Sequence, residues 1–493
     1  MSNKKRVFED IDFNENSGKG DDFDDDDELS SGNELLDSDD EIMEEDLIEQ
    51  EEQDEGDELK DMDIKDGEEE DNLPKKVWRA GVDKLEEDEV LDYDSTAYDM
   101  MHEMTVEWPC LSFHPLHDHL GSGRNKYPHT MYMVAGTQAD EPKNNKILIM
   151  KLSSLHKTKY DDIDSDDEES DNEDEEDEED NGDDSDDEAE LSYNYISHQG
   201  AVNRIRAMEQ QSHIIATWSE NRQVYIWNIK NHLKSLDDDS KPPKITAPVH
   251  LVNHHQDEGY ALDWSTKVVG KLASGDCKKL IYVTSATDAT WVTDQTPYKG
   301  HTGSVEDIQW SPSEDTVLAS CSIDQTVKIW DTRLHQKPAA SVKAHKADVN
   351  VISWSKNVQY LMVSGSDDGS FRVWDLRNFK SDQPVSDFKY HQGPITSIEW
   401  NPYEESQIIV SSGDNQVTIW DFSLEEDTEE FKDTSVTNND DDEDLQYPPQ
   451  LFFIHQGQTD VKEVHWHPQI PHVAISTAYE GFNIFKTSNS EEQ

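Results

Sequence analysis

The sequence predicts an all-β fold, a seven-bladed β-propeller that carries an N-terminal helical arm and long disordered acidic segments. Three observations support this prediction. The second half of the chain repeats with a period of 44–46 residues, the clearest repeats open with a His and close with Trp-Asp, and apolar and polar residues alternate between turns. Alternation with period two is typical of half-buried strands, and a repeat of this length with these residues is typical of a propeller blade.

Three consecutive repeats match the WD40 blade most closely. In each, an aspartate lies six residues before the closing tryptophan, and the opening histidines and closing tryptophans are both spaced by 44 and 46 residues. A buried aspartate must be paired or hydrogen-bonded, and in WD repeats it bonds the opening histidine. Such sets resemble hydrolase triads, but they recur once per blade, so they are interpreted as structural: His301, Asp324 and Trp330; His345, Asp368 and Trp374; His391, Asp414 and Trp420.

Degenerate copies extend the repeat to the rest of the propeller. One runs from His198 to Trp227, another has Asp276 in its turn and Tyr282 at the tryptophan position, and the last begins at His455. Upstream, the runs EWPCLSFHPL, TMYMVAGTQ and KILIMKL read as three further strands. Six repeats plus this N-terminal set give seven blades. We expect an N-terminal strand to pair with C-terminal strands, because ring closure removes open sheet edges.

The formal charge of −70 is concentrated in three segments. Residues 1–72 hold 33 acidic and 6 basic residues, residues 161–190 hold 22 and none, and residues 423–444 hold 11 and 1. Like-charged blocks with few apolar residues are expected to be disordered. A polyanion repels the phosphate backbone of nucleic acid. The chain is therefore expected to bind basic proteins and not to contact nucleic acid directly.

These features predict the domain organisation. Residues 1–74 form an acidic tail, 75–104 an arm with a helix, 105–486 the propeller and 487–493 a C-terminal tail. Two acidic insertions, 161–190 and 423–447, interrupt the propeller. The first is expected between KILIMKL, the last strand of the N-terminal set, and the blade that opens at His198. The second ends in Pro448-Pro449, directly before LFFIHQG.

The segment EVLDYDSTAYDMMHEMTVEWPCLSF predicts a helix followed by a strand. Asp94 or Ser95 can serve as the N-cap, and Tyr98, Met101 and Met104 form an apolar stripe at helical spacing. Two interpretations stay open. The stripe either docks on the propeller wall or forms one wall of a groove for a partner helix.

The sequence predicts no enzyme activity, cofactor, metal site or membrane span. The three cysteines are far apart, which suits neither a disulfide framework nor a metal knuckle. No run of about 18 apolar residues occurs, and no Gly-rich phosphate loop follows a strand. Two groups of histidines are the best metal candidates, but the first lies in a blade strand and the second lacks Cys or acidic partners: His465, His467 and His472; His250, His254 and His255.

From residue 75 to 486 the chain resembles the histone-binding WD-repeat proteins, the family of the retinoblastoma-binding chaperone and the small subunit of chromatin assembly factor. The resemblance is carried by YDMMHEMTVEWPCLSF and by the acidic insertion running into YPPQLFFIHQGQTDVKEVHWHP. In that family an N-terminal helix and an acidic loop ending in Pro-Pro flank a side pocket that grips a helix of histone H4. The resemblance implies partner-binding residues here, with Tyr98 and Met101 on the arm and nine positions at the loop: Asp440, Asp441, Asp442, Glu443, Asp444, Pro448, Pro449, Phe453 and Ile454.

Within this broad family the chain is most similar to the glutamate-rich WD-repeat proteins, which are nuclear and nucleolar ribosome-assembly factors that bind histones. The similarity rests on KKVWRAGVDKLEEDEVL, WPCLSF, DHLG at 118–121, AGTQAD at 135–140 and the insertion after KILIMKLSSLHKT. It implies a non-enzymatic, monomeric chaperone in the nucleus and nucleolus. Its client would be the third protein of the large ribosomal subunit, with histones H3 and H4 as further partners and pre-ribosomal particles as indirect ones.

Two alternative functions remain. The chain could be a histone-binding subunit of a chromatin assembly or remodelling complex, as in the broader family. It could also be a substrate receptor of a cullin ubiquitin ligase, because Trp330-Asp331-Thr332-Arg333 and Trp374-Asp375-Leu376-Arg377 fit the WDxR pattern of such adaptors. Arg333 and Arg377 would then contact the cullin adaptor, whereas the structural interpretation is an arginine that ends an ordinary blade strand.

Overall fold

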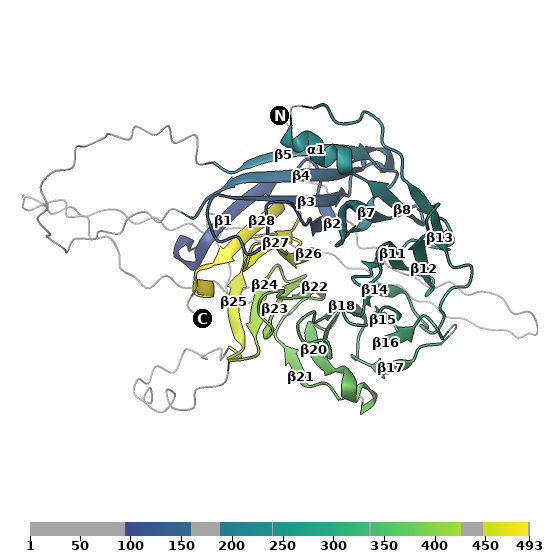
Figure 1. Ribbon diagram of the computed structural model, residues 1–493. Helices are drawn as coiled ribbons and strands as arrows, with labels where there is room; N and C mark the ends of the chain where they lie inside the picture. Colours follow the sequence, from purple (N-terminus) through teal and green to yellow (C-terminus); the bar gives the residue numbers. More distant parts are fainter. Residues whose placement is uncertain are drawn as a thin grey trace, which may run out of the picture. The chain divides into compact units, whose positions relative to one another are not determined.

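Seven four-stranded antiparallel sheets follow one another around a ring (Figure 1). The computed structural model describes residues 94–158, 188–238, 240–334, 337–381, 383–424 and 447–491. By its internal contacts the chain divides after Lys75, and all the described residues belong to the second unit. The predicted all-β propeller with seven blades is confirmed.

Each blade is a meander whose first strand lines the central channel and whose fourth strand is outermost. The blades are numbered here in ring order, and the bounds of their strands are as follows. Blade 1 contains β2 (Cys110–Pro115), β3 (His129–Thr137), β4 (Lys146–Leu155) and β5 (Glu190–Ser197); blade 2 contains β6 (Val202–Met208), β7 (Gln211–Ser219), β8 (Gln223–Asn228) and β9 (His250–Val252); blade 3 contains β10 (Ala261–Trp264), β11 (Lys271–Gly275), β12 (Ile281–Ala286) and β13 (Trp291–Thr293).

The remaining blades have the same order. Blade 4 contains β14 (Val305–Trp310), β15 (Val317–Ser322), β16 (Thr326–Asp331) and β17 (Ala340–Lys343); blade 5 contains β18 (Val349–Trp354), β19 (Leu361–Ser366), β20 (Ser370–Asp375) and β21 (Ser386–Lys389); blade 6 contains β22 (Ile395–Trp400), β23 (Gln407–Ser412), β24 (Val417–Asp421) and β25 (Leu451–His455); blade 7 contains β26 (Glu463–Trp466), β27 (Val473–Thr477), β28 (Gly481–Thr487) and β1 (Tyr98–Thr105). Helical elements are short: α1 (Lys230–Asp237) and the 3-10 helices Ser95–Ala97, Pro142–Asn144, Leu376–Ser381 and Ser488–Glu491.

The opening histidine ties the strands of a blade together. In blade 4, His301 Nδ1 donates to the Asp324 carboxylate at 2.9 Å, and the Ser320 hydroxyl donates to His301 Nε2 at 2.7 Å. The same hydroxyl accepts the indole N–H of Trp330 at 2.8 Å. Blade 6 repeats the arrangement with a threonine in place of the serine, through His391, Asp414, Thr418 and Trp420.

Blade 5 reaches its turn aspartate indirectly. His345 bonds Ser364 at 2.8 Å, and Ser364 accepts the indole N–H of Trp374 at 2.9 Å. The other ring nitrogen of His345 bonds the Ser370 hydroxyl, which in turn donates to Asp368. Burial lowers the pKa of His345 to about 4, so the ring is neutral at physiological pH. Each of these histidines is therefore used inside its own blade.

The interpretation of the sequence missed the opening histidine of blade 3, which is His255. Its Nδ1 bonds Asp276 at 3.0 Å and its Nε2 bonds Ser274 at 2.8 Å. The separation of 19 residues between His255 and Ser274 equals that between His301 and Ser320, and this spacing could have identified it. His255, one of the metal candidates, thus belongs to the blade framework.

The ring closes as predicted, because β1 pairs with β28 in register Met101↔Phe485 and Met104↔Phe482. A second closure lies nearer the channel, where blade 7 meets blade 1. One carboxylate oxygen of the fully buried Glu463 accepts the Ser112 hydroxyl and the backbone N–H of Phe113, both at 2.8 Å. N-terminal and C-terminal sequence therefore share two adjoining closures.

The predicted helix beginning at Asp94 or Ser95 is wrong beyond one turn. Asp94 does accept the N–H of Thr96, but only the 3-10 turn Ser95–Ala97 follows, and strand β1 begins at Tyr98. The apolar residues are required on both faces of this strand, since Met104 packs between blades 7 and 1 and Met101 packs toward blade 6. A stripe at helical spacing thus also satisfies a strand buried on both sides. The rest of the arm, residues 75–93, lies outside the described residues.

The first acidic insertion also has a different place from the predicted one. It does not precede a new blade at His198. Residues 156–189 instead connect β4 to β5, the third and fourth strands of blade 1. The YNYIS run after the insertion forms the outermost strand of that blade. The second insertion likewise connects the third and fourth strands of blade 6, β24 and β25.

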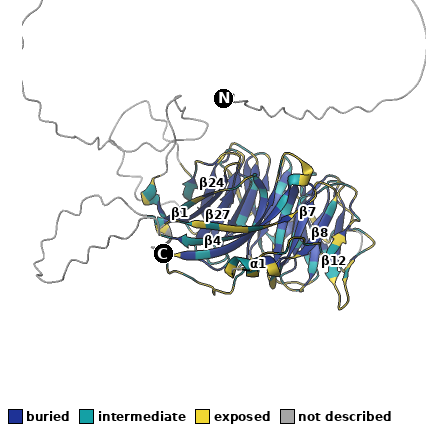
Figure 2. Cartoon of the chain, turned by 90° about the horizontal axis from the view of Figure 1, so that it is seen from above, coloured by how far each residue is buried: buried dark blue, intermediate teal, exposed yellow. Residues whose placement is uncertain are grey.

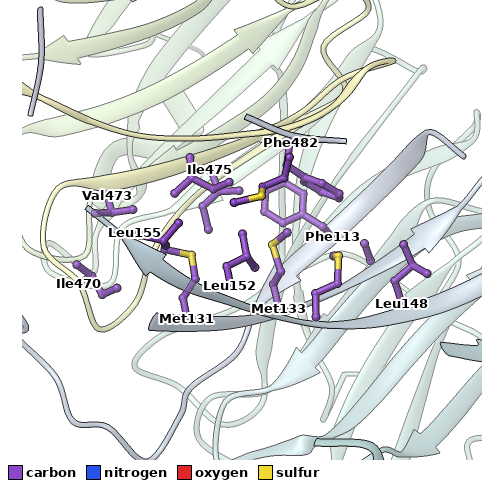
Figure 3. Close-up of a cluster of buried hydrophobic side chains, with 14 of the residues drawn as sticks. Phe113, Met131, Met133, Leu148, Leu152, Leu155, Ile470, Val473, Ile475 and Phe482 are labelled. Carbon is purple, nitrogen blue, oxygen red and sulfur yellow. The ribbon is translucent and has the colours of Figure 1, made fainter. Parts of the chain in front are cut away.

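The core consists of clusters between neighbouring blades, and buried residues follow the strand interiors (Figure 2). The cluster between blades 7 and 1 is rich in methionine and includes Met131, Met133, Phe113 and Phe482 (Figure 3). Within the described residues, no group of three or more His, Cys, Asp or Glu side chains could hold a metal ion. No helix among them is long and apolar enough to span a membrane.

Candidate functional site

The candidate site is the outer wall formed by β25 of blade 6 and β1 of blade 7. The outer strand of a blade faces a neighbouring blade on one side and solvent on the other, so its apolar residues should alternate. In β25, however, four consecutive apolar residues, Leu451 to Ile454, are all half-buried. Apolar side chains therefore lie on both faces of this edge strand, which leaves part of them open to solvent.

Tyr98 lies beneath this wall and joins its two strands. Its ring contacts Phe453 edge-on, with centroids 5.3 Å apart, and its hydroxyl hydrogen-bonds His455 Nδ1 at 2.8 Å. The His455 ring in turn stacks on Phe485 at 4.2 Å. Burial lowers the pKa of His455 to about 4, which keeps this hydrogen-bonded ring neutral. The order of the wall thus depends on a neutral histidine.

The predicted partner-binding residues divide into two groups. Tyr98 and Met101 are only 4% and 8% exposed, so they support the wall from below and offer little surface to a partner. Phe453 and Ile454 remain half-buried on β25 itself. The structure brings Tyr98 together with Phe453, which no sequence separation of this length would have indicated.

The Pro448-Pro449 pair forms the turn that leads into β25. Pro448 is half-buried and Pro449 is exposed, and the N–H of Leu451 donates to the carbonyl of Pro448 at 2.9 Å. Tyr447 stands exposed before the turn, with its ring centroid 6.5 Å from that of Tyr390. The five acidic candidates lie outside the described residues: Asp440, Asp441, Asp442, Glu443 and Asp444.

Leu451, Phe452 and His455 belong to this wall although the sequence was not interpreted in that way. The signal was present, because LFFI is a run of four large apolar residues at the edge of a blade, where the other outer strands carry polar residues, as in SDFK of β21. His455 was recognised only as a blade opener, since its contact with Tyr98 joins residues 357 positions apart.

The two WDxR arginines occupy equivalent places on blades 4 and 5. Arg333 forms a two-pronged ion pair with Asp331, and Arg377 forms the same pair with Asp375, each with a shortest distance of 2.6 Å. Hydrogen bonds from Arg333 lower the pKa of Asp331 to about 2. Arg377 also lies over the Tyr360 ring at 3.6 Å. Both arginines are exposed, so each is held in position and still accessible.

Comparison with known proteins matches two family models. The model that describes histone-binding protein RBBP4 and its counterpart in the CAF1 complex matches residues 88–156, and the WD domain, G-beta repeat model matches residues 293–331, 336–375 and 382–421. Among solved structures, the WD40 β-propeller domain of Doa1 superposes with a TM-score of 0.50 at 12% identity, over 80% of this chain and 97% of that one. This last similarity supports the fold alone.

Full-length relatives are much more similar. Glutamate-rich WD repeat-containing protein 1 of Dictyostelium discoideum is 69% identical over all of both chains. Protein HEAT STRESS TOLERANT DWD 1 of Arabidopsis thaliana is 47% identical over 85% of this chain and 92% of its own. Ribosome assembly protein rrb1 of Schizosaccharomyces pombe is 41% identical over 90% of this chain and 91% of its own.

Proposed function

The chain belongs to the family of glutamate-rich WD repeat-containing proteins, and from this we propose that it is a non-enzymatic chaperone for basic proteins, acting in the nucleus and nucleolus during assembly of the large ribosomal subunit. Two comparisons support the proposal: the ribosome assembly protein rrb1 is a full-length relative, and a histone-binding family model matches the start of the propeller. The proposed client is the third protein of the large subunit, with histones H3 and H4 as a second class.

One observation carries the proposal. The acidic insertion 423–447 leads directly into β25, the edge strand whose four consecutive apolar residues are half-buried. A basic protein meant for nucleic acid carries dense positive charge together with apolar segments that aggregate when free. The chain offers a counterpart for both, because the polyanionic segment and the apolar edge strand are adjacent in sequence.

The two parts have different energetic roles. Exposed ion pairs contribute only about 0–1 kcal/mol each and are screened by salt, so the acidic segments mainly attract the client and raise its association rate. Burial of apolar surface at about 25 cal/mol per Å² supplies the affinity that distinguishes one client from another. RNA, a competing polyanion, then displaces the client at its destination.

Neutralising the acidic insertions is expected to slow capture more than it weakens selectivity. Asp→Asn and Glu→Gln replacement throughout residues 161–187 and 425–444 keeps chain length and leaves strand β5 intact. The association rate with the purified ribosomal protein at low salt should fall by about 10-fold or more, while the dissociation rate changes little. Stopped-flow or surface-plasmon-resonance kinetics at two salt concentrations measure both rates.

A matched variant separates the two roles. Ile454→Ala removes apolar surface from β25, and it should raise the dissociation rate while leaving the salt dependence of association unchanged. If the neutralised chain associates at low salt as fast as the wild type, capture by the acidic insertions is wrong.

A second candidate function, substrate receptor of a cullin ubiquitin ligase, is favoured by the equal geometry of the exposed Arg333 and Arg377 pairs on adjacent blades. Replacing either arginine with alanine should then abolish co-purification of a cullin adaptor from cells. The blades would remain folded, since exposed pairs of this kind contribute little stability. Lys462→Ala, which breaks the Lys462–Asp460 pair on blade 7, is the control. Equal recovery of the adaptor with all variants would contradict this function.

A further inference from the structure

The three acidic segments join the propeller at equivalent points on three adjacent blades. Residues 423–447 precede β25 of blade 6, residues 1–72 precede β1 of blade 7, and residues 161–190 lead into β5 of blade 1. Hydrogen bonds between neighbouring blades establish the adjacency, from Ser397 to Val464 and from Ser112 to Glu463. Figure 1 shows β25, β1 and β5 in succession around the ring.

All three segments also join at the same face. Each of these strands is the outermost of its meander and runs antiparallel to the third strand, so it begins where the third strand ends. The first residue of β1, Tyr98, accordingly pairs with Thr487 at the end of β28. The sequence distributes its acidic residues over the whole chain, but the fold attaches them to one sector of one face.

Within this sector, Tyr193 and Tyr195 of β5 expose their rings, at 53% and 54% of their surface. They are two residues apart and therefore lie on one face of the strand. Their cross-strand partners, Met150 and Leu148, belong to the cluster between blades 7 and 1, so this face looks toward blade 7. The opposite face of β5 is already occupied, since Asn194 donates to the helix α1.

The Tyr195 ring already contacts a cation. Lys146 Nζ lies 5.1 Å from the ring centroid and 2.7 Å from the carboxylate of Glu107, which is itself exposed. An ammonium on a flexible stem held by an exposed ion pair is readily displaced. An arginine guanidinium is planar, more weakly hydrated than an ammonium, and stacks on aromatic faces. This ring pair is therefore better suited to arginine than to the lysine present.

We propose that Tyr193 and Tyr195 form a stacking platform for an arginine-rich segment of the basic client. The occupant follows from charge complementarity, because the strand that carries both rings directly follows an insertion with 22 acidic and no basic residues. The platform is separate from the β25 wall and lies on the other side of β1. The identity of the client rests on the proposed function, whereas the preference for arginine rests on the ring pair itself.

The test compares ring removal with hydroxyl removal in the full-length chain. Tyr193→Ala/Tyr195→Ala and Tyr193→Phe/Tyr195→Phe are titrated with two synthetic peptides, one of alternating Arg and Gly and one of alternating Lys and Gly. The alanine pair should weaken binding of the arginine peptide by about 5- to 30-fold. The phenylalanine pair should bind it within about 2-fold of the wild type, and the lysine peptide should respond less to either pair.

Tyr479→Ala is the matched control, because Tyr479 is equally exposed but lies between β27 and β28, at the opposite face of the ring. It should leave both affinities unchanged, and thermal unfolding should be the same for all variants. Unchanged arginine-peptide affinity in the alanine pair, or an equal loss for both peptides, overturns the platform and leaves the proposed function intact. Failure of the wild type to bind the purified ribosomal protein or histones overturns the proposed function instead.

Discussion

Replacing Glu463 with alanine is expected to lower the free energy of unfolding of the propeller by about 3–5 kcal/mol. One carboxylate oxygen accepts from Arg204 and Arg206 of blade 2, each at 2.7 Å, and the other accepts the hydroxyl of Ser112 and the N–H of Phe113 in blade 1. One side chain thus joins three blades. Its loss leaves two arginines without their carboxylate in a largely buried place.

The electrostatics of this group agree with that expectation. Burial alone would oppose ionisation, but Arg206, His465 and Arg204 hold the pKa of Glu463 well below its usual range. Glu463→Gln should fall between alanine and wild type, because it keeps the shape and loses the charge. Glu107→Ala, which removes one exposed ion pair, should change stability by less than about 1 kcal/mol.

Urea unfolding followed by tryptophan fluorescence measures these differences. A loss smaller than about 1 kcal/mol for Glu463→Ala would mean that β1–β28 pairing closes the ring without help from the channel.

Acidification from about pH 6.5 to about pH 4 is expected to destabilise the propeller steeply. Burial lowers the pKa of four histidines to about 4: His129, His198, His345 and His455. Below the ordinary histidine value the unfolded chain binds protons that the folded chain does not, so stability falls with pH until the folded groups titrate. Each histidine contributes roughly 1.4 kcal/mol per pH unit across this window.

Two groups act in the opposite direction. Burial raises the pKa of Asp263 to about 7, and Glu399 and Glu463 raise that of His465 against the effect of its burial. Their folded forms gain protons before the unfolded chain does, so they stabilise the propeller as pH falls. Four groups against two leave a net loss of stability.

Denaturant unfolding at a series of pH values measures the slope. His198→Gln should reduce the slope by the contribution of one group, while substitution of the exposed His119 should not change it. A flat profile between pH 7 and pH 5 would contradict the expected proton uptake. Since His455 orders the β25 wall through Tyr98, client binding should weaken over the same pH range.

Much of the candidate site followed from sequence, for a local reason. Pro448, Pro449, Phe453 and Ile454 are consecutive or nearly so, and a strand edge displays neighbouring residues together. The arm failed by the same logic. Tyr98 and Met101 are spaced as on a helix, but their partners Phe453 and Phe485 lie more than 350 residues away, and pairing with β28 decided the conformation.

The sequence by itself determined the number and type of blades, because each blade forms from contacts within one repeat and its His, Asp and Trp recur at fixed spacing. It also determined the charge of the three acidic segments, which is a property of composition. Only the tertiary structure decided where these segments attach. Closure of the ring brings blades 6, 7 and 1 together, so β25, β1 and β5 become neighbours although they lie at opposite ends of the chain. Glu463, which accepts from two other blades, became recognisable only then, because nothing in its local sequence distinguishes a buried carboxylate that joins three blades from an exposed one.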